Sequence, residues 1–159
     1  MEEAIKEAIK GYEKDEVPVG AVVVFNNKII GRGYNQTEGL KDPTAHAEIL
    51  AISAAANYLN NWRLTDTTIY CTLEPCPMCI GAILLARVKR LVFGLSDRKF
   101  GACGSVVDLV REKLFNHKVE IRGDVEKERI KELMQGFFKK RRKLRRGGRV
   151  AEGARLEIA

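Results

Sequence analysis

The stretch "TTIYCTLEPCPMCIGAILLA", residues 67–86, decides the fold of this chain. Its first seven residues predict a strand, and the part from Pro77 to about Ala86 predicts a helix. Cys76 then takes an N-cap position, and proline is favoured at the first helical position. Cys79 follows three residues later on the same side of the helix. Two thiols therefore meet at a helix start that directly follows a strand.

The segments on either side predict alternating strands and helices. Further helices are expected over residues 2–14 and 45–58, with a last helix capped by Asp124. Further strands are expected over residues 17–25, 28–34, 89–94 and 118–122, the first two joined by a hairpin turn at Asn26-Asn27. The last helix has an apolar face of Ile130, Leu133, Met134 and Phe137. The simplest architecture is an α/β fold of three layers, α/β/α, with a central mixed sheet of about five strands.

Length and composition predict one folded domain. A chain of 159 residues with 45% hydrophobic residues suits a single sizeable core. The longest apolar runs are too short to cross a bilayer, and "MEEAIKEAIK", residues 1–10, is too acidic for a signal or transit peptide. We therefore expect a cytoplasmic protein with no membrane contact, a domain over residues 1–143 and a basic, flexible tail over residues 144–159.

The net charge of +7 comes from one segment. Residues 139–149, "KKRRKLRRGGR", carry eight Lys or Arg residues and no acid, which leaves 20 basic against 21 acidic residues elsewhere. A basic block beside a neutral body suggests binding to a polyanion through phosphate contacts. On charge alone, a solvated tail that aids solubility explains the segment equally well.

The Cys-x-x-Cys pair of residues 76–79 fits either a redox pair or a metal site. His46 opens the helix of residues 45–58, so two helix starts could bring one His and two Cys ligands to a single cation. Three protein ligands leave a fourth position open for water, whereas structural zinc sites are closed by four. Glu48 then serves as a proton carrier beside that water. Taken singly, a lone His is more often a partly buried structural residue, and a lone Glu on a helix usually faces solvent.

The motifs together resemble a known family. "HAE" at residues 46–48 and "PCPMC" at residues 75–79 match the H-x-E and P-C-x-x-C signature of zinc-dependent nucleobase deaminases. Adding "EVPVGAVVV", "DPTAHAEILAI", "TLEPCPMCIGAIL", "VFGLSD", "GACGS" and "NHKVEI", the chain resembles the bacterial tRNA-specific adenosine deaminases over roughly residues 5 to 140. The resemblance implies a cytidine deaminase-like fold, a homodimer, and hydrolytic conversion of adenosine to inosine at the wobble position of a tRNA anticodon stem-loop.

The same resemblance implies roles for individual residues. His46, Cys76 and Cys79 would hold one Zn²⁺ per chain, and Glu48 would be the general acid and base. Asn35 would hydrogen-bond the target nucleoside, and Leu73 and Pro75 would wall its pocket. The remaining expected substrate contacts are Asp97, Lys99 and His117 in the body of the fold, and Phe137, Phe138, Arg141 and Arg142 on the last helix, which offer stacking and phosphate contacts.

Some residues depart from the family pattern. Cys71 stands in a strand where the family usually has an apolar residue, and we expect it in the core. Cys103 lies in the "GACGS" turn, and we expect a spare thiol there, not a fourth ligand. Residues 147–159 have no counterpart in the pattern.

Two other classes of protein compete with this interpretation. A deaminase of a small free substrate, such as cytidine, deoxycytidylate or guanine, would share His46, Glu48, Cys76 and Cys79. A non-catalytic RNA-binding module with a structural zinc would share the metal ligands, but it has no use for Glu48 beside an open coordination position. The basic segment argues against the free-substrate enzyme, which needs no grip on a polyanion.

Overall fold

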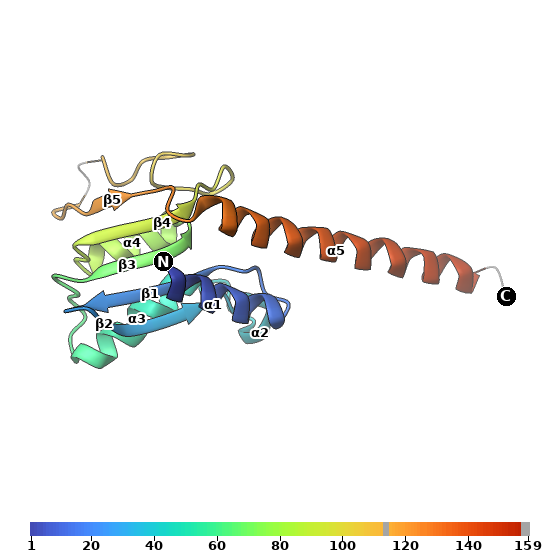
Figure 1. The fold of residues 1–159 in the computed structure, drawn as a ribbon, viewed down its shortest axis with the longest axis horizontal. Coiled ribbons are helices and arrows are strands. Elements are labelled where there is room, and N and C mark those ends of the chain that lie inside the picture. The colour runs from blue at the N-terminus through green and yellow to red at the C-terminus, as the bar shows by residue number, and fades with distance from the viewer. Residues whose placement is uncertain (113–114, 157–159) are drawn as a thin grey trace.

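The computed structural model describes residues 1–112 and 115–156, and side chains up to residue 146. It contains helices α1 (Glu2–Glu13), α2 (Thr37–Leu40), α3 (Ala47–Leu59), α4 (Pro77–Leu85) and α5 (Lys127–Leu156), and strands β1 (Gly20–Phe25), β2 (Lys28–Tyr34), β3 (Thr68–Leu73), β4 (Arg90–Leu95) and β5 (Glu120–Arg122). Figure 1 shows the strands as one sheet between helices, with α5 extending away from the body. The predicted three-layer fold is confirmed.

The sheet is mixed, with strand order β2-β1-β3-β4-β5. Strand β1 is antiparallel to both β2 and β3, whereas β3, β4 and β5 run parallel to one another. The parallel pair β3 and β4 ends at Leu73 and Leu95, which are register partners. Because chain segments that leave the carboxyl ends of adjacent parallel strands emerge side by side, this edge is where a site is expected in such sheets.

The β1–β2 hairpin brings α3 close to the sheet. Asn26 and Asn27 both have positive φ, as a two-residue turn between twisted strands requires, so the predicted turn is confirmed. In β2, a Cβ on Gly31 would come within 2.2 Å of the Ala51 carbonyl oxygen, and a Cβ on Gly33 within 2.3 Å of the Ala47 oxygen. Only glycine permits this approach, which fixes where α3 begins.

Helices α1 and α5 pack against the opposite face of the sheet from α3 and α4. Ile130 and Phe137 of α5 are buried, and the Phe137 ring lies 5.7 Å from that of Tyr12 in α1, in edge-to-face geometry. The predicted apolar face of the last helix is therefore confirmed. Its predicted cap is wrong: α5 begins at Lys127, while Asp124 has a φ of 62° and pairs with Lys127 at 2.9 Å.

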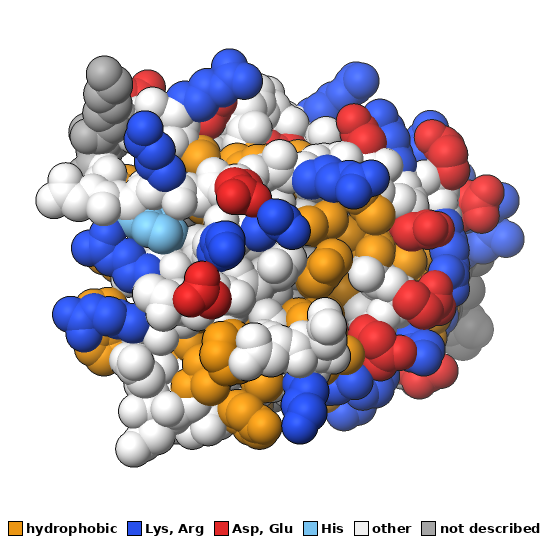
Figure 2. Space-filling model, turned by 60° about the vertical axis from the view of Figure 1, so that its left-hand side comes forward, with side chains coloured by type: hydrophobic (Ala, Val, Ile, Leu, Met, Phe, Trp, Pro, Cys, Tyr) orange, Lys and Arg blue, Asp and Glu red, His pale blue; other side chains and the backbone are white. Residues whose placement is uncertain are grey.

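Helix α5 is a single element from Lys127 to Leu156, so it runs across residue 143 and through the basic segment, residues 139–149. At 1.5 Å per residue its length is about 45 Å. Within the part of the chain that is described, no helix combines the length and apolar character needed to cross a bilayer. On the face of the body drawn in Figure 2, Lys and Arg side chains are interspersed with Asp and Glu, consistent with a nearly neutral body.

Candidate active site

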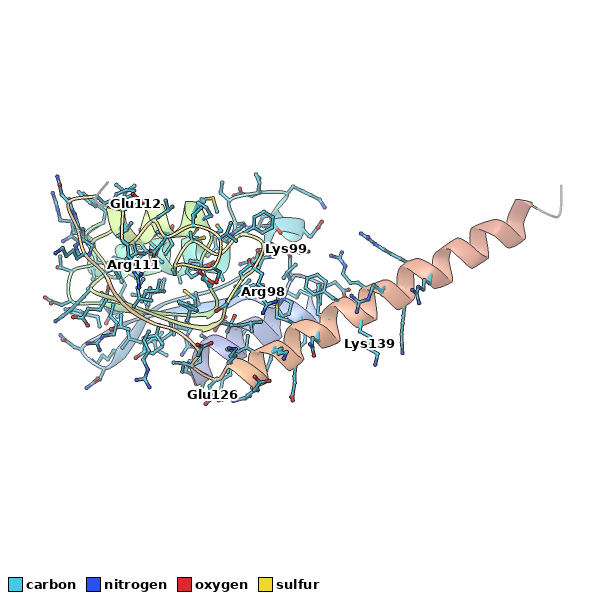
Figure 3. The ribbon with its side chains drawn as sticks, turned by 90° about the horizontal axis from the view of Figure 1, so that it is seen from above. Arg98, Lys99, Arg111, Glu112, Glu126 and Lys139 are labelled. Atoms are coloured by element: carbon cyan, nitrogen blue, oxygen red, sulfur yellow. The ribbon has the colours of Figure 1, made fainter. Side chains whose placement is uncertain are left out.

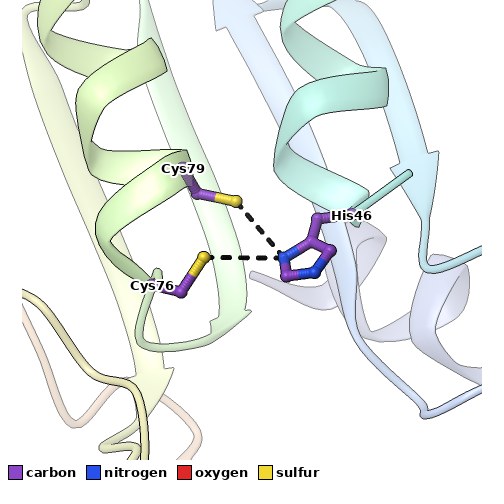
Figure 4. A group of neighbouring side chains, drawn as sticks. All are labelled: His46, Cys76 and Cys79. Carbon is purple, nitrogen blue, oxygen red and sulfur yellow. Dashed lines mark hydrogen bonds between the residues drawn. The ribbon is translucent and has the colours of Figure 1, made fainter. Parts of the chain in front are cut away.

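Two helix starts converge at the carboxyl end of β3. His46 is the N-cap residue of α3 and Cys76 is the N-cap residue of α4, both in extended conformation, with Pro77 at the first position of α4. Cys79 lies one turn into α4 and points toward the same place (Figure 4). The His46 Nδ1 atom is 3.6 Å from the Cys76 Sγ atom and 3.5 Å from the Cys79 Sγ atom.

These three side chains fit a tetrahedral metal ion. Their ligating atoms all lie within 4.8 Å of one another, and among the described residues they are the group of His, Cys, Asp or Glu side chains that could hold a metal. Bond lengths of about 2.05 Å to nitrogen and 2.3 Å to sulfur at a tetrahedral angle put the two ligand atoms about 3.6 Å apart. The predicted convergence of His46, Cys76 and Cys79 is therefore confirmed as a site able to bind a metal.

The Cys76 thiol is held in the ionised form. A hydrogen bond from the Cys79 thiol, together with His46, stabilises the Cys76 thiolate and lowers the pKa of Cys76 to about 4. The same bond raises the pKa of Cys79, because Cys79 is its proton donor. The hydrogen bond with Cys76 also raises the pKa of His46. One anionic sulfur is thus available at neutral pH, which is the form that binds a metal.

Glu48 lies in the first turn of α3, and its side chain is only 3% exposed. Burial is the main cause that raises the pKa of its carboxyl above the ordinary value. It faces the same cleft as His46 and Cys76. A carboxyl with a raised pKa beside a metal site can both accept and return a proton near neutral pH.

The cleft has a volume of about 1620 Å³ and opens at the carboxyl ends of β3 and β4. Nine of the residues predicted to belong to the site line it: Asn35, His46, Glu48, Leu73, Cys76, Asp97, Lys99, Phe138 and Arg142. Pockets for small molecules usually measure about 300 to 1,000 Å³, so this cleft can take more than a single nucleoside.

Three predicted substrate contacts, Pro75, Phe137 and Arg141, do not line the cleft. Pro75 is buried and accepts a hydrogen bond on its carbonyl from the Ala102 amide at 2.9 Å. Phe137 is 1% exposed, and the Arg141 guanidinium lies 5.5 Å from the centre of its ring. A base cannot stack on a buried ring, which corrects the stacking role predicted for Phe137: it anchors α5 to the body. Its neighbour Phe138 is 41% exposed and lines the cleft.

His117 is not brought to the cleft. Its Nε2 atom lies 2.7 Å from the Val88 carbonyl oxygen, before the start of β4. It lines a smaller pocket with Arg87 and Lys89, at the opposite end of β4 from Asp97. The predicted contact between His117 and a nucleotide held in the cleft does not follow from this geometry.

The remaining cysteines stand apart from the metal-binding group. Cys71 is fully buried in the core, as predicted, and burial raises the pKa of its thiol. Cys103 is half-buried on the segment after β4, and burial likewise raises its thiol pKa. Neither thiol belongs to the group that could hold a metal.

Sequence reasoning missed the buried acids that support the cleft. The Glu16 carboxyl accepts hydrogen bonds from the Asn35 side-chain amide at 3.2 Å and from the Gly39 backbone at 2.6 Å. It thereby ties Asn35 to the start of α2. The Glu74 carboxyl likewise accepts hydrogen bonds from the Asp97 and Cys103 backbone amides, in the segment after β4. The signal for Glu74 was an acid placed directly between a buried strand and a proline, where no solvent-facing role is expected.

Cationic side chains gather at the mouth of the cleft. Arg98, Lys99, Lys127, Lys131 and Arg142 all line it, although they come from the segment after β4 and from α5. Figure 3 shows Arg98 and Lys99 on the side of the body from which α5 extends, with Lys139 farther along that helix. The basic segment is therefore continuous with a cationic rim around the cleft, an arrangement suited to a phosphate backbone.

Known proteins share this arrangement over most of the chain. Residues 1–142 match the MafB19-like deaminase family. The tRNA-specific adenosine deaminase of Bacillus subtilis (strain 168) is 46% identical over 149 residues, covering 94% of this chain and 92% of its own.

Two solved structures are also similar. One, from a study of A-to-I editing by tRNA:A34 deaminases at the wobble position of transfer RNA, has 41% identity and a TM-score of 0.81, covering 84% of this chain and 96% of that chain. Guanine deaminase from Bacillus subtilis has 39% identity and a TM-score of 0.57, but covers only 60% of this chain and 61% of that chain. With its His-Cys-Cys cluster, buried Glu48 and near full-length similarity, this chain belongs to the family of tRNA-specific adenosine deaminases.

Proposed function

We propose that this protein hydrolyses adenosine to inosine at the wobble position of a tRNA anticodon, using one zinc ion per chain. The observation that carries the proposal is the position of Glu48, a buried acid beside the cluster of His46, Cys76 and Cys79 in a cleft with a cationic rim. A structural zinc module has no need for this acid.

His46, Cys76 and Cys79 hold the zinc in this proposal, since one imidazole and two thiolates suit that ion. When bound, zinc supplies Lewis acidity that lowers the pKa of a water molecule. Three protein ligands would leave a fourth position of the ion for that water, and His46 and Cys76 both line the cleft. The lowered pKa of Cys76 favours its thiolate, which is the form that ligates a metal.

Glu48 moves the protons of the reaction. Its carboxylate accepts a proton from the attacking water and delivers it to ring nitrogen N1 as the new bond to C6 forms. It then takes the remaining proton from the hydroxyl group now on C6 and gives it to the amino group, which leaves as ammonia as its bond to C6 breaks, while C6 keeps the oxygen of the water. Burial, which raises the pKa of Glu48, helps its carboxyl to accept a proton and hold it near neutral pH, where an exposed Glu would lose it.

The walls of the cleft orient the target nucleotide. Asn35 and Leu73 lie on the side of α2 and β3, and Asp97 and Lys99 on the segment after β4, so a nucleotide flipped between them has polar partners on two sides. Phe138 offers an exposed ring at the mouth, where a neighbouring base of the anticodon loop can stack. Arg142 lies next to it for the phosphate.

The partner in this proposal is the anticodon stem-loop of a tRNA. Single-stranded loops present unstacked bases, and a basic helix beside the cleft gives phosphate contacts to the adjoining stem. We also propose that the enzyme acts as a homodimer in the cytoplasm, where tRNA is its substrate.

A small free base or nucleoside is the second candidate substrate. The similarity to guanine deaminase, 39% identity over 60% of the chain, supports this candidate. Incubation of the protein with an anticodon stem-loop and, in parallel, with free adenosine, cytidine and guanine separates the two. Inosine in the stem-loop at a rate far above that of any free substrate supports the tRNA enzyme, and faster turnover of a free substrate overturns it.

A further inference from the structure

Glu74 is a buried acid that the proposed chemistry does not use. It follows β3 directly and stands two residues before Cys76, yet it is not among the side chains that could hold a metal. Its side chain is 2% exposed and forms part of the cleft wall. A buried carboxyl is costly unless its oxygens are hydrogen-bonded, so its partners indicate its purpose.

All the partners of the Glu74 carboxyl come from one segment, residues 96–105. Oε1 accepts hydrogen bonds from the backbone amides of Cys103 at 2.9 Å and Ser105 at 3.2 Å. Oε2 accepts one from the Asp97 amide at 3.0 Å and one from the Ser105 hydroxyl. Each oxygen thus receives two neutral donors, which fills the acceptor positions of a carboxylate. The carboxyl has none left for a substrate.

Packing also joins Glu74 to residues 96–105. A Cβ on Gly101 would lie 2.5 Å from the Glu74 carboxyl, so the segment wraps tightly around it. On the other side of Glu74, the Pro75 carbonyl accepts the Ala102 amide at 2.9 Å. The turn that carries Cys76 and the segment after β4 are therefore joined through the Glu74 side chain and the Pro75 backbone.

The segment that Glu74 holds supplies one wall of the cleft. Ser96, Asp97, Arg98, Lys99, Phe100 and Ser105 all line the cleft from it. Asp97 and Lys99 are the side chains assigned above to the substrate, and the Lys99 amide in turn donates to the Asp97 carboxyl at 2.8 Å. We propose that Glu74 is a positioning residue for substrate binding: it fixes residues 96–105 as the wall that receives the target nucleotide. This inference rests on the proposed function.

The chemistry of a Glu74→Gln substitution shows why the effect falls on this wall. Glutamine has the same size, but its amide nitrogen cannot accept a hydrogen bond. If the nitrogen takes the place of Oε2, the Ser105 hydroxyl can turn round and accept, while the Asp97 amide loses its partner. If it takes the place of Oε1, two backbone donors lose theirs. A buried donor without a partner destabilises the arrangement that leaves it unpaired.

The test compares Glu74→Gln, Ser105→Ala and a matched control, Glu7→Gln. Glu7 is an equally buried acid, 3% exposed, that pairs with Lys10 at 2.7 Å on α1 and does not line the cleft. Hydrogen exchange of the RNA-free protein reports on the amides of Asp97, Cys103 and Ser105, independently of any activity. Kinetics with an anticodon stem-loop give KM and kcat, and anisotropy gives the stem-loop Kd.

We expect Glu74→Gln to speed exchange in residues 96–105, leave bound zinc unchanged, and raise KM and Kd about tenfold with kcat changed less than about threefold. Ser105→Ala removes one hydrogen-bond donor to Glu74 and leaves the turn that carries Cys76 intact. We expect it to speed exchange in the same segment and to raise KM about threefold. Glu7→Gln should leave exchange in this segment and KM unchanged.

Unaltered exchange in residues 96–105 of both variants overturns the inference. So does faster exchange with unchanged KM and Kd, because the segment would then be held without serving the substrate. An inactive wild-type protein would count against the proposed function alone, since the exchange and the stem-loop Kd would still decide the role of Glu74.

Discussion

The metal-binding cluster and the basic segment of α5 are built in opposite ways. His46 is 30 residues away from Cys76 and meets the Cys76–Cys79 pair only because two helices start at the same edge of the sheet. Residues 139–149 carry eight positive charges and no acid in one local segment, on a helix that leaves the body. In the proposed function the body carries the chemistry and the helix holds the RNA, so we expect the two to be disabled separately.

The largest effect is expected from the loss of a metal ligand. Cys76→Ser removes the thiolate whose pKa lies lowest in the cluster, so the variant should bind less than about a tenth of a zinc per chain and lose at least about a thousandfold in rate. Atomic absorption measures the metal, and circular dichroism checks the fold. Full zinc occupancy in the folded variant would refute the assignment of Cys76, whereas stem-loop binding through the basic segment should survive.

Substitution of Glu48 is expected to lower the rate almost as much as Cys76→Ser, but without loss of zinc. Glu48→Ala removes the carrier of both protons but no ligand, so kcat should fall by about 10²- to 10⁴-fold while zinc content and stem-loop affinity stay at wild-type values. The contrast with Cys76→Ser separates proton transfer from metal binding. Near-normal turnover would remove Glu48 from the mechanism, and zinc loss would make it a structural or ligating group.

Truncation after Phe138 addresses the other half of the comparison. It removes the basic segment, so stem-loop affinity should fall and the slope of log K against log salt should flatten by about 0.7 to 0.9 for each phosphate that the segment no longer neutralises. Saturating turnover should change by less than about threefold, since the chemistry lies in the body. Lys140 makes only exposed interactions with Asp15, at 3.2 Å, and Tyr12, so the fold should persist without them.

Truncation after Arg146 is the matched control for this experiment, and it should change neither affinity nor slope appreciably. If removal of residues 139–159 leaves affinity and salt slope as they are, the basic segment serves solubility. The RNA must then be held by the rim of the cleft around Asp97 and Lys99.

The smallest effect is expected at Cys103. Its thiol lies outside the metal-binding group, and burial raises its pKa and keeps it neutral. Cys103→Ser should therefore leave zinc content and kcat within experimental error of the wild-type values. A drop in zinc comparable to that of Cys76→Ser would mean that the site is closed by a fourth ligand, and the open position required for catalysis would be absent.

The sequence predicted the parts of the fold that depend on local chemistry. Alternating runs located all five strands, and the N-cap chemistry of Cys76-Pro77 located the start of α4. The Asn26-Asn27 turn was predictable because few residues accept positive φ in succession. The cap predicted at Asp124 was wrong because Asp suits a left-handed turn as well as a helix N-cap. Asp124 adopts the left-handed conformation three residues before α5 begins.

What the sequence could not give is the identity of neighbours across long separations. Phe137 and Phe138 are consecutive and chemically alike, yet one is buried against Tyr12 and the other lines the cleft. Only the angle at which α5 crosses α1 decides between them. His117 and Asp97 were both expected to contact the substrate, but they lie at opposite ends of β4. Glu74 gained its role from amides some 23 to 31 residues away, which no local pattern reveals.

The most direct test of the account is to map inosine along an anticodon stem-loop that contains several adenosines in its loop and stem. After incubation with the zinc-loaded protein, reverse transcription reads each inosine as guanosine at its position. The account predicts conversion of the wobble adenosine alone, abolished by Glu48→Ala, because the cleft places a single flipped nucleotide beside one buried acid. Conversion at many adenosines, or conversion of free nucleoside in preference to the stem-loop, would contradict it.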